Sequence, residues 1–219
     1  MIRLMEYTIR RGEPVSDEIK RIVGGKIEAG IEHIDSDIGR HETVHEVRKR
    51  CKEVRASARL VRPVLPTYRE VNAHYRDAAR RISDIRDAHA AIETFDDHVR
   101  AAAEDDGRLS ADTLDGVRET LVNRRDEMAT GQDLDQRLAN VRADLVKGRE
   151  RVPDLPIATD GYDAIAGGLR KSYKRARNRM PEAYENPEFE AFHEWRKRIS
   201  AHRNTSDRLV VAQHFELSD

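Results

Sequence analysis

Residues 41–61 read HETVHEVRKRCKEVRASARLV, and this stretch combines an apolar helical pattern with a row of basic side chains. At about 100° per residue, one side of a helix would carry the apolar set Val47, Cys51, Val54, Ala58 and Val61. Another side would carry the basic set His45, Arg48, Lys49, Lys52, Arg55 and Arg59. The pattern predicts an amphipathic helix over about His41 to Val61 that packs by one side and presents cations on the other.

Part of this stretch recurs near the end of the chain. The sequence HEVRKR at 45–50 returns as HEWRKR at 193–198, an offset of 148 residues (193 minus 45), with five of six positions identical. A basic residue also follows each motif histidine by ten positions, at Arg55 and Arg203. The recurrence predicts that a helical half of the protein is duplicated.

The helix expected around the second motif divides its faces in the same way. Its basic side would carry His193, Arg196, Lys197 and Arg203, and its core side would carry Trp195, Ile199 and Leu209. Ser200 stands where the first copy has Lys52. Asn204 and Asp207 stand where the first copy has neutral or basic residues. We therefore expect the second basic row to be weaker than the first.

A third basic run lies in residues 170–179, which contain six Lys or Arg residues and no acid. Within a predicted helix over Tyr162 to Met180, Arg170, Lys174 and Arg177 share one face, next to Lys171. The opposite stripe is apolar: Ile165, Leu169, Ala176 and Met180. We interpret this helix as a further wall of the same anion site, against the alternative of a solvated basic helix.

Such rows fit a linear polyanion. One cation holds a phosphate weakly in water, whereas cations one helical turn apart can meet successive phosphates. Arg offers a bidentate fork, Lys a mobile point charge, and His a hydrogen bond or a charge that depends on pH. The overall balance of 40 basic and 41 acidic residues, a net charge of -1, gives no global attraction, so the anion site must be local.

The remaining sequence predicts an all-α protein with almost no sheet, since aromatic residues are only 5% of the chain. Ser16 is expected to cap a first helix, and an extended piece is possible at residues 7–9. Thr67 to Glu70 reads as a capping box for a third helix that extends towards Ala103. A fourth helical stretch after Ser110, interrupted near Thr130, should end before Pro153. The last helix is expected to begin at Asn186-Pro187.

The single cysteine, Cys51, cannot form an intramolecular disulfide, and the chain has no signal sequence or long apolar stretch. These features predict an intracellular, cytoplasmic protein.

Five segments together resemble the CHAD domain, short for conserved histidine α-helical domain. They are Glu13-Pro14-Val15, His45-Glu46-x-Arg48-Lys49, Ser83-x-x-Arg86-Asp87, Gly168-Leu169-Arg170-Lys171-Ser172-Tyr173 and His193-Glu194-x-Arg196-Lys197. The resemblance implies two pseudo-symmetric helical bundles around a basic cavity or groove that binds inorganic polyphosphate, with polyphosphate granules as an expected location. In this family the domain sometimes stands beside a triphosphate-hydrolysing domain, and no such companion is visible in this sequence.

The domain expected from this resemblance covers residues 1–219, with a first helical repeat at about 15–151 and a second, partial repeat at about 160–217. The first repeat has four predicted helical stretches and the second only two. A homodimer is one way to complete the second bundle, and a fragment or a naturally short chain are the others.

Two other functions compete with polyphosphate binding. Nucleic acid could lie along the same cations, but no aromatic stacking platform is predicted beside the motifs. His41, Glu42 and His45 fit the zinc-hydrolase pattern H-E-x-x-H, yet cations follow His45, and the position 148 residues after His41 holds Phe189, so the second copy lacks this histidine. A purely structural helical adaptor is the third alternative. The sequence therefore favours a non-catalytic binding protein with no metal and no cofactor.

Overall fold

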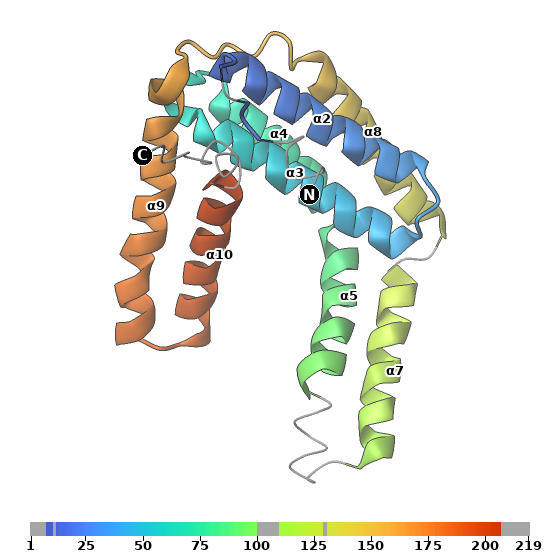
Figure 1. The fold of residues 1–219 in the computed structure, drawn as a ribbon. Helices are drawn as coiled ribbons and strands as arrows, with labels where there is room; N and C mark the ends of the chain where they lie inside the picture. The colour runs from blue at the N-terminus through green and yellow to red at the C-terminus, as the bar shows by residue number, and fades with distance from the viewer. Residues whose placement is uncertain (1–7, 11, 100–109, 129–130, 207–219) are drawn as a thin grey trace, which may run out of the picture.

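The computed structural model describes residues 8–10, 12–99, 110–128 and 131–206. This part of the chain is helical and contains no strand, which confirms the all-α prediction. The helices form an arch, in which four helices make a crossbar and two helical pairs extend from it as legs (Figure 1).

The crossbar holds the main hydrophobic core. It consists of α2 (Val15–Asp35), α3 (Arg40–Leu60), α4 (Tyr68–Arg80) and α8 (Gly131–Glu150). The apolar side predicted for α3 is buried here, with Val47, Cys51 and Val54 fully enclosed. Gly39 precedes α3 with a φ of 87°, a left-handed conformation that glycine adopts without steric cost. The 3-10 turn η1 (Arg62–Val64) follows α3, as expected where Pro63 prevents the helix from continuing.

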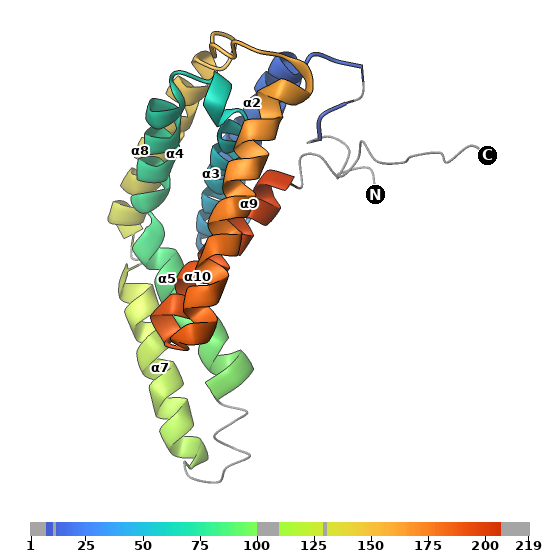
Figure 2. The ribbon, with the colours of Figure 1, turned by 90° about the vertical axis from the view of Figure 1, so that its left-hand side faces the viewer.

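The two legs extend towards the same side of the crossbar. One pairs α5 (Ser83–Thr94) and the π-helical turn η2 (Phe95–Val99) with α7 (Ala111–Met128). The other pairs α9 (Gly161–Glu185) with α10 (Phe189–Ser206). Figure 2, turned by 90°, shows α5 and α7 below the crossbar, while α9 begins at the height of α2 and runs downwards. The arch therefore has an inner side, onto which parts of α3 and both legs can face.

Long-range contacts move several helix starts away from their predicted positions. Ser16 does not cap the first helix, because α2 begins at Val15 and its N–H donates to the Asp160 carboxylate at 2.5 Å. Thr67 precedes α4, but its side chain makes no capping hydrogen bond, so the predicted capping box is wrong. Asn186 instead ends α9, its N–H donating to the Glu182 carbonyl, and the last helix begins at Phe189.

The predicted third helix is two helices. The chain bends between Arg80 and Ser83, where α4 ends and α5 begins. Arg137 of α8 donates to the carbonyl of Arg81 at 3.4 Å and to the Asp84 carboxylate at 2.8 Å. This side chain thus compensates the backbone group that the break frees. The predicted end at Ala103 lies outside the described residues, as does Tyr7, whereas Thr8 and Ile9 of the predicted extended piece are described and form no strand.

The apolar sides predicted for α9 and α10 are only partly covered. Ile165 and Ala176 are buried, but Met180 is exposed. Trp195 is half-buried in ring contacts with Tyr184 and Phe192, and Ile199 is exposed, so the predicted core side of α10 is wrong. Leu209 lies outside the described residues. Burial of these positions depends on which other helices pack against them, and a helical wheel contains no information on those helices.

None of the helices in the described ranges is both long and apolar enough to span a bilayer.

Candidate anion-binding site on the inner side of the arch

A row of four cations on α3 forms the centre of the candidate site. The residues are three or four positions apart, so they share one face of the helix: Arg48, Lys52, Arg55 and Arg59. For each of them, burial is the main cause that lowers its pKa, and neighbouring cations lower it further. Positive charges that are partly removed from water and close to one another favour an anion between them.

Arg55 and Arg59 are held by neutral groups. Arg55 donates to the Asn72 side-chain oxygen at 3.0 Å, and Arg59 hydrogen-bonds to the Tyr68 side chain. Both partners come from α4, which packs beside α3. Neither guanidinium makes an ion pair with a described carboxylate, so their full charge is available to a ligand.

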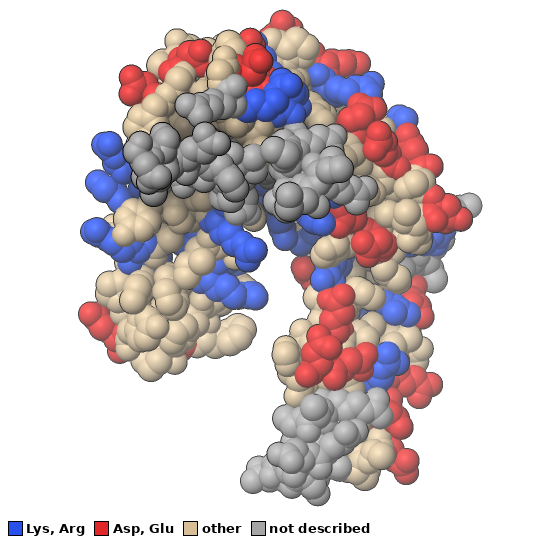
Figure 3. All heavy atoms as spheres, in the orientation of Figure 1, with Lys and Arg blue, Asp and Glu red and all other residues tan. Residues whose placement is uncertain are grey.

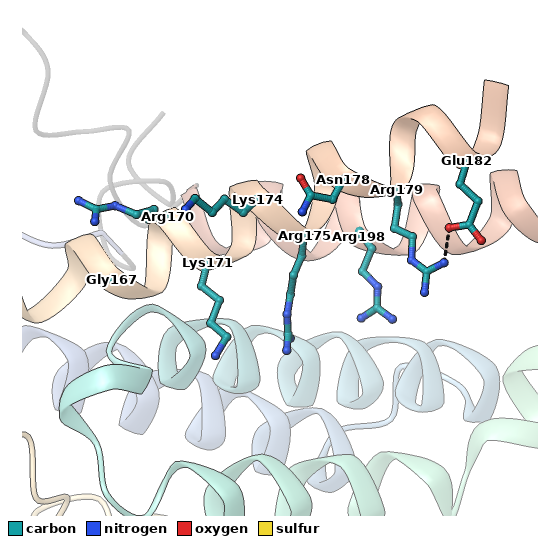
Figure 4. A pocket seen from close by; sticks show the side chains of 9 residues that line it. All are labelled: Gly167, Arg170, Lys171, Lys174, Arg175, Asn178, Arg179, Glu182 and Arg198. Carbon is teal, nitrogen blue, oxygen red and sulfur yellow. Dashed lines mark hydrogen bonds and ion pairs between the residues drawn. The ribbon is translucent and has the colours of Figure 1, made fainter. Parts of the chain in front are cut away.

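The α9–α10 leg supplies a second cationic wall. Figure 4 shows Lys171 and Arg175 of α9 and Arg198 of α10 pointing towards the crossbar helices. Burial is the main cause that lowers the pKa of Arg59, and the charges of Arg175 and Arg198 lower it further, which agrees with the facing walls in Figure 4. A hollow of about 700 Å³ lies along this wall, lined by Gly167, Arg170, Lys171, Lys174, Arg175, Asn178, Arg179, Glu182 and Arg198.

Two glycines determine how closely α9 approaches α3. A Cβ on Gly168 would lie 1.8 Å from the Leu60 carbonyl oxygen, and one on Gly167 would lie 2.8 Å from Pro63 Cγ. Only glycine fits at Gly168, because the obstacle is backbone and cannot move aside. This close packing places the next turns of α9, with Lys171 and Arg175, opposite the cationic row.

The glutamates of the two motifs bind neighbouring bases within their own helices. Glu46 pairs with Lys49 at 2.7 Å and Arg50 at 2.6 Å. Glu194 pairs in the same way with Lys197 at 2.6 Å and Arg198 at 3.4 Å. Lys49 and Lys197, both predicted as ligand-binding residues, are therefore already partly neutralised. The two motifs share these pairs, while their common origin stays a prediction.

The motif histidines lie at the margins of the site. His45 Nε2 is 4.0 Å from Glu46 Oε1, and the His193 ring stacks on Phe189 with centroids 5.8 Å apart. Among the other predicted residues, Arg170 and Lys174 line the hollow. Arg177, Arg196 and Arg203 are exposed and do not line it. Their part in binding stays a prediction.

Arg175, Arg179 and Arg198 line the hollow but were not among the predicted site residues. The wheel of α9 favoured the face of Arg170, Lys174 and Arg177, because its apolar stripe was taken as the buried side. The signal that could have found Arg175 is the Gly167-Gly168 pair, which marks the side of closest approach. Arg175 lies seven residues, or two turns, after Gly168.

The H-E-x-x-H pattern has a different structural setting. The ring of His41 stacks on His89 of α5, with centroids 5.0 Å apart and an interplanar angle of 11°. Burial, then the charges of Arg125 and His89, lower the pKa of His41. Across the described ranges, no three His, Cys, Asp or Glu side chains gather closely enough to hold a metal ion.

The protein is thus helical and nearly neutral in total charge, and it carries a local cationic surface on the inner side of the arch. Figure 3 shows basic side chains along the α9–α10 leg and acidic ones along the α5–α7 leg. The family model described as CHAD domain matches residues 26–209, so the chain belongs to the CHAD domain family. Searches of curated proteins and of solved structures find no match.

Proposed function

We propose that this protein binds inorganic polyphosphate, without catalysis, between α3 and the α9–α10 leg. The observation that carries the proposal is the cationic row on α3, in which Arg48, Arg55 and Arg59 are half-buried, facing a second row from α9. The central members, Arg55, Arg59, Lys171 and Arg175, have no ion-pair partner among the described carboxylates. CHAD domains are associated with polyphosphate in general, which agrees with this chemistry.

The geometry suits a linear ligand better than a compact one. Cations that follow each other every three or four residues along α3 are spaced by about 5–6 Å, the length of one helical turn. A polyphosphate chain can place successive charged groups along such a row, and each guanidinium can bind two oxygens. Binding would release counterions from the ligand and would weaken as salt rises.

A binding role without chemistry is supported by the lining of the hollow. Its side chains are five bases of α9, Arg198, Asn178 and Glu182, beside the backbone of Gly167. Glu182 is already engaged in an ion pair with Arg179. This set contains no hydroxyl or thiol nucleophile with an adjacent base, and so fits anion binding better than phosphoryl transfer.

Single-stranded nucleic acid is the second candidate, and one feature of the α9–α10 leg favours it. Tyr184, Phe192 and Trp195 form a partly exposed aromatic cluster, and Phe189 is exposed beside them. Bases could stack on such rings while phosphates follow the cations. The cluster lies near the tip of the leg, whereas the cationic row lies at its base on α3, so polyphosphate remains the better fit.

The test is direct binding of length-defined polyphosphate and of single-stranded RNA across a range of salt concentrations. We expect tight polyphosphate binding that outcompetes RNA. The double variant Arg59→Gln, Arg175→Gln should weaken it strongly and reduce the salt slope by roughly two, about one for each lost phosphate contact.

The matched control removes two cations elsewhere. Arg142 and Arg149 of α8 pair with Asp35 and Glu28 of α2, so Arg142→Gln, Arg149→Gln changes the net charge equally without changing a residue of the candidate site. It should bind polyphosphate almost as the wild type does. Equal losses in both variants, or preference for RNA, would contradict the proposal.

A further inference from the structure

The inner side of the arch has two halves that differ in their carboxylates. Near the α5–α7 leg, Arg48 Nη2 lies 3.6 Å from Asp87 Oδ1, and Arg86 Nη2 lies 2.8 Å from Glu93 Oε2. Near the α9–α10 leg, Arg55 and Arg59 are held by Asn72 and the Tyr68 side chain instead. Cations are therefore neutralised at one end of the row and unneutralised at the other.

The α5 side chains belong to the same row as those of α3. Burial is the main cause that lowers the pKa of Lys52, the charges of Arg48 and Arg86 lower it further, and the charge of Asp87 opposes them. Asp87 is likewise the main charge that opposes the lowering of the Arg48 pKa, which burial causes. Arg86 thus adds a cation from α5 to the surroundings of Arg48 and Lys52, where Asp87 pairs with Arg48 and Glu93 pairs with Arg86.

Exposure shows which partner in each pair can leave. The side chains of Asp87 and Glu93 are 71% and 47% exposed, whereas those of Arg48 and Arg86 are 15% and 20% exposed. An exposed carboxylate loses little when it turns into water, since exposed ion pairs are weak. A half-buried guanidinium that loses its partner needs another anion. A phosphate group can take that place.

We propose that Asp87 and Glu93 compete with the ligand for Arg48 and Arg86, and thereby reduce the affinity that a long polyanion gains over a short one. This inference rests on the proposed function. A short polyphosphate binds only at the unneutralised half, around Arg55, Arg59 and the α9 wall. A longer one also reaches Arg48 and Arg86, and must displace the two carboxylates to do so.

The dimensions of α3 separate the two kinds of ligand. Arg48 and Arg59 are eleven residues apart (59 minus 48), or about 16 Å along the helix axis, whereas Arg55 and Arg59 are about 6 Å apart. Tripolyphosphate can span the shorter distance but not the longer one. A chain of several tens of phosphates spans both with ease.

The experiment compares tripolyphosphate with long-chain polyphosphate on the wild type and on Asp87→Asn, Glu93→Gln, which keeps both shapes and removes both charges. Long-chain affinity should rise roughly three- to tenfold, the scale of two exposed ion pairs. Tripolyphosphate affinity should change by less than about twofold at physiological salt, because screening acts over about 8 Å. The control Glu28→Gln, Asp35→Asn on α2 removes the same charge far from the row and should change neither ligand.

An equal rise for both ligands, a rise in the α2 control of the same size, or an unchanged long-chain affinity would overturn the competition by Asp87 and Glu93. A wild type that binds neither polyphosphate would instead overturn the proposed function itself.

Discussion

Helices α3 and α10 carry nearly the same motif in different surroundings. In α3, Val44, Val47 and Cys51 are fully buried. At the positions 148 residues later in α10, Phe192 and Ile199 are 39% and 42% exposed, and Trp195 is only partly covered. The bases of the two motifs nevertheless pair with Glu46 and Glu194 in the same way.

This difference separates what a motif determines from what its neighbours determine. Ion pairs at three- and four-residue spacing form within one helix, so they follow from the local sequence. Burial requires other helices, and α3 is packed against α2, α4, α5, α9 and α10, whereas the described contacts of α10 are with α9 and α3. The motif by itself therefore makes a basic helix, and the packing of α3 makes the half-buried row that can bind an anion.

The largest expected contrast is in thiol chemistry at equivalent positions. Burial raises the pKa of Cys51 to about 12, so its reactive thiolate is scarce and shielded in the folded protein. We expect Cys51 to react with a thiol reagent at least about a hundredfold more slowly than a cysteine at position 199. Alkylation rates measured on the wild type and on Cys51→Ala, Ile199→Cys provide the comparison.

In denaturant, both cysteines should react at similar rates, which controls for intrinsic differences. Similar rates in the folded proteins would mean that α3 is no better covered than α10, and would remove the basis of the comparison.

A matched truncation extends the comparison to stability. Ile27 of α2 is fully buried against α3, whereas Ile199 is exposed. Ile27→Ala should lower the free energy of unfolding by about 2–5 kcal/mol, because it leaves a cavity in the crossbar. Ile199→Ala should change it by less than about 0.5 kcal/mol in dilute solution, as expected for a surface position. Urea unfolding of both variants measures the difference.

The same pair tests the homodimer, which is one of the three alternatives that the sequence allows for the partial second repeat. If a second copy covers α10, the stability cost of Ile199→Ala should grow with protein concentration, while that of Ile27→Ala should not. A concentration-independent cost at position 199 would contradict the dimer.

The smallest expected contrast concerns the motif glutamates. Burial would raise the pKa of Glu46, but the Lys49 hydrogen bond and the charges of Arg50, Lys49 and His33 outweigh it, so the pKa is lowered. A carboxylate with a lowered pKa stabilises the fold above its ordinary pKa and loses this contribution as pH falls through the lowered value. Glu46→Gln should therefore cost about 1–2 kcal/mol near neutral pH, with the cost shrinking in acid.

Glu194→Gln is the control, since Glu194 makes the same pairs at a more exposed site, where the Lys197 hydrogen bond is the main cause of its lowered pKa. Its cost should be smaller and should fall with pH in the same direction. Urea unfolding at several pH values measures both, and an equal cost for the two variants would contradict the role of burial.

Much of the fold follows from the sequence because its determinants are local. The apolar spacing of α3, the prolines after it and the basic row all lie within one stretch of chain. The errors occur where distant residues decide: Asp160 accepts the first N–H of α2, and Arg137 compensates the break after Arg80. No local pattern contains these partners.

The candidate site shows the same division. Arg48, Lys52, Arg55 and Arg59 could be placed on one face from helical spacing alone. Arg175 and Arg198 could not be placed opposite them, because their position depends on the approach of Gly168 to Leu60 and on the pairing of α9 with α10.

The central claim is that one polyanion contacts α3 and α9 together, and lysine footprinting tests it most directly. Acetylation rates can be measured by mass spectrometry with and without long-chain polyphosphate. The account predicts that Lys52, Lys171 and Lys174 are protected together, while the exposed Lys147 of α8 is not. Protection of Lys147 to the same degree, or protection of Lys52 without Lys171, would contradict a shared site inside the arch.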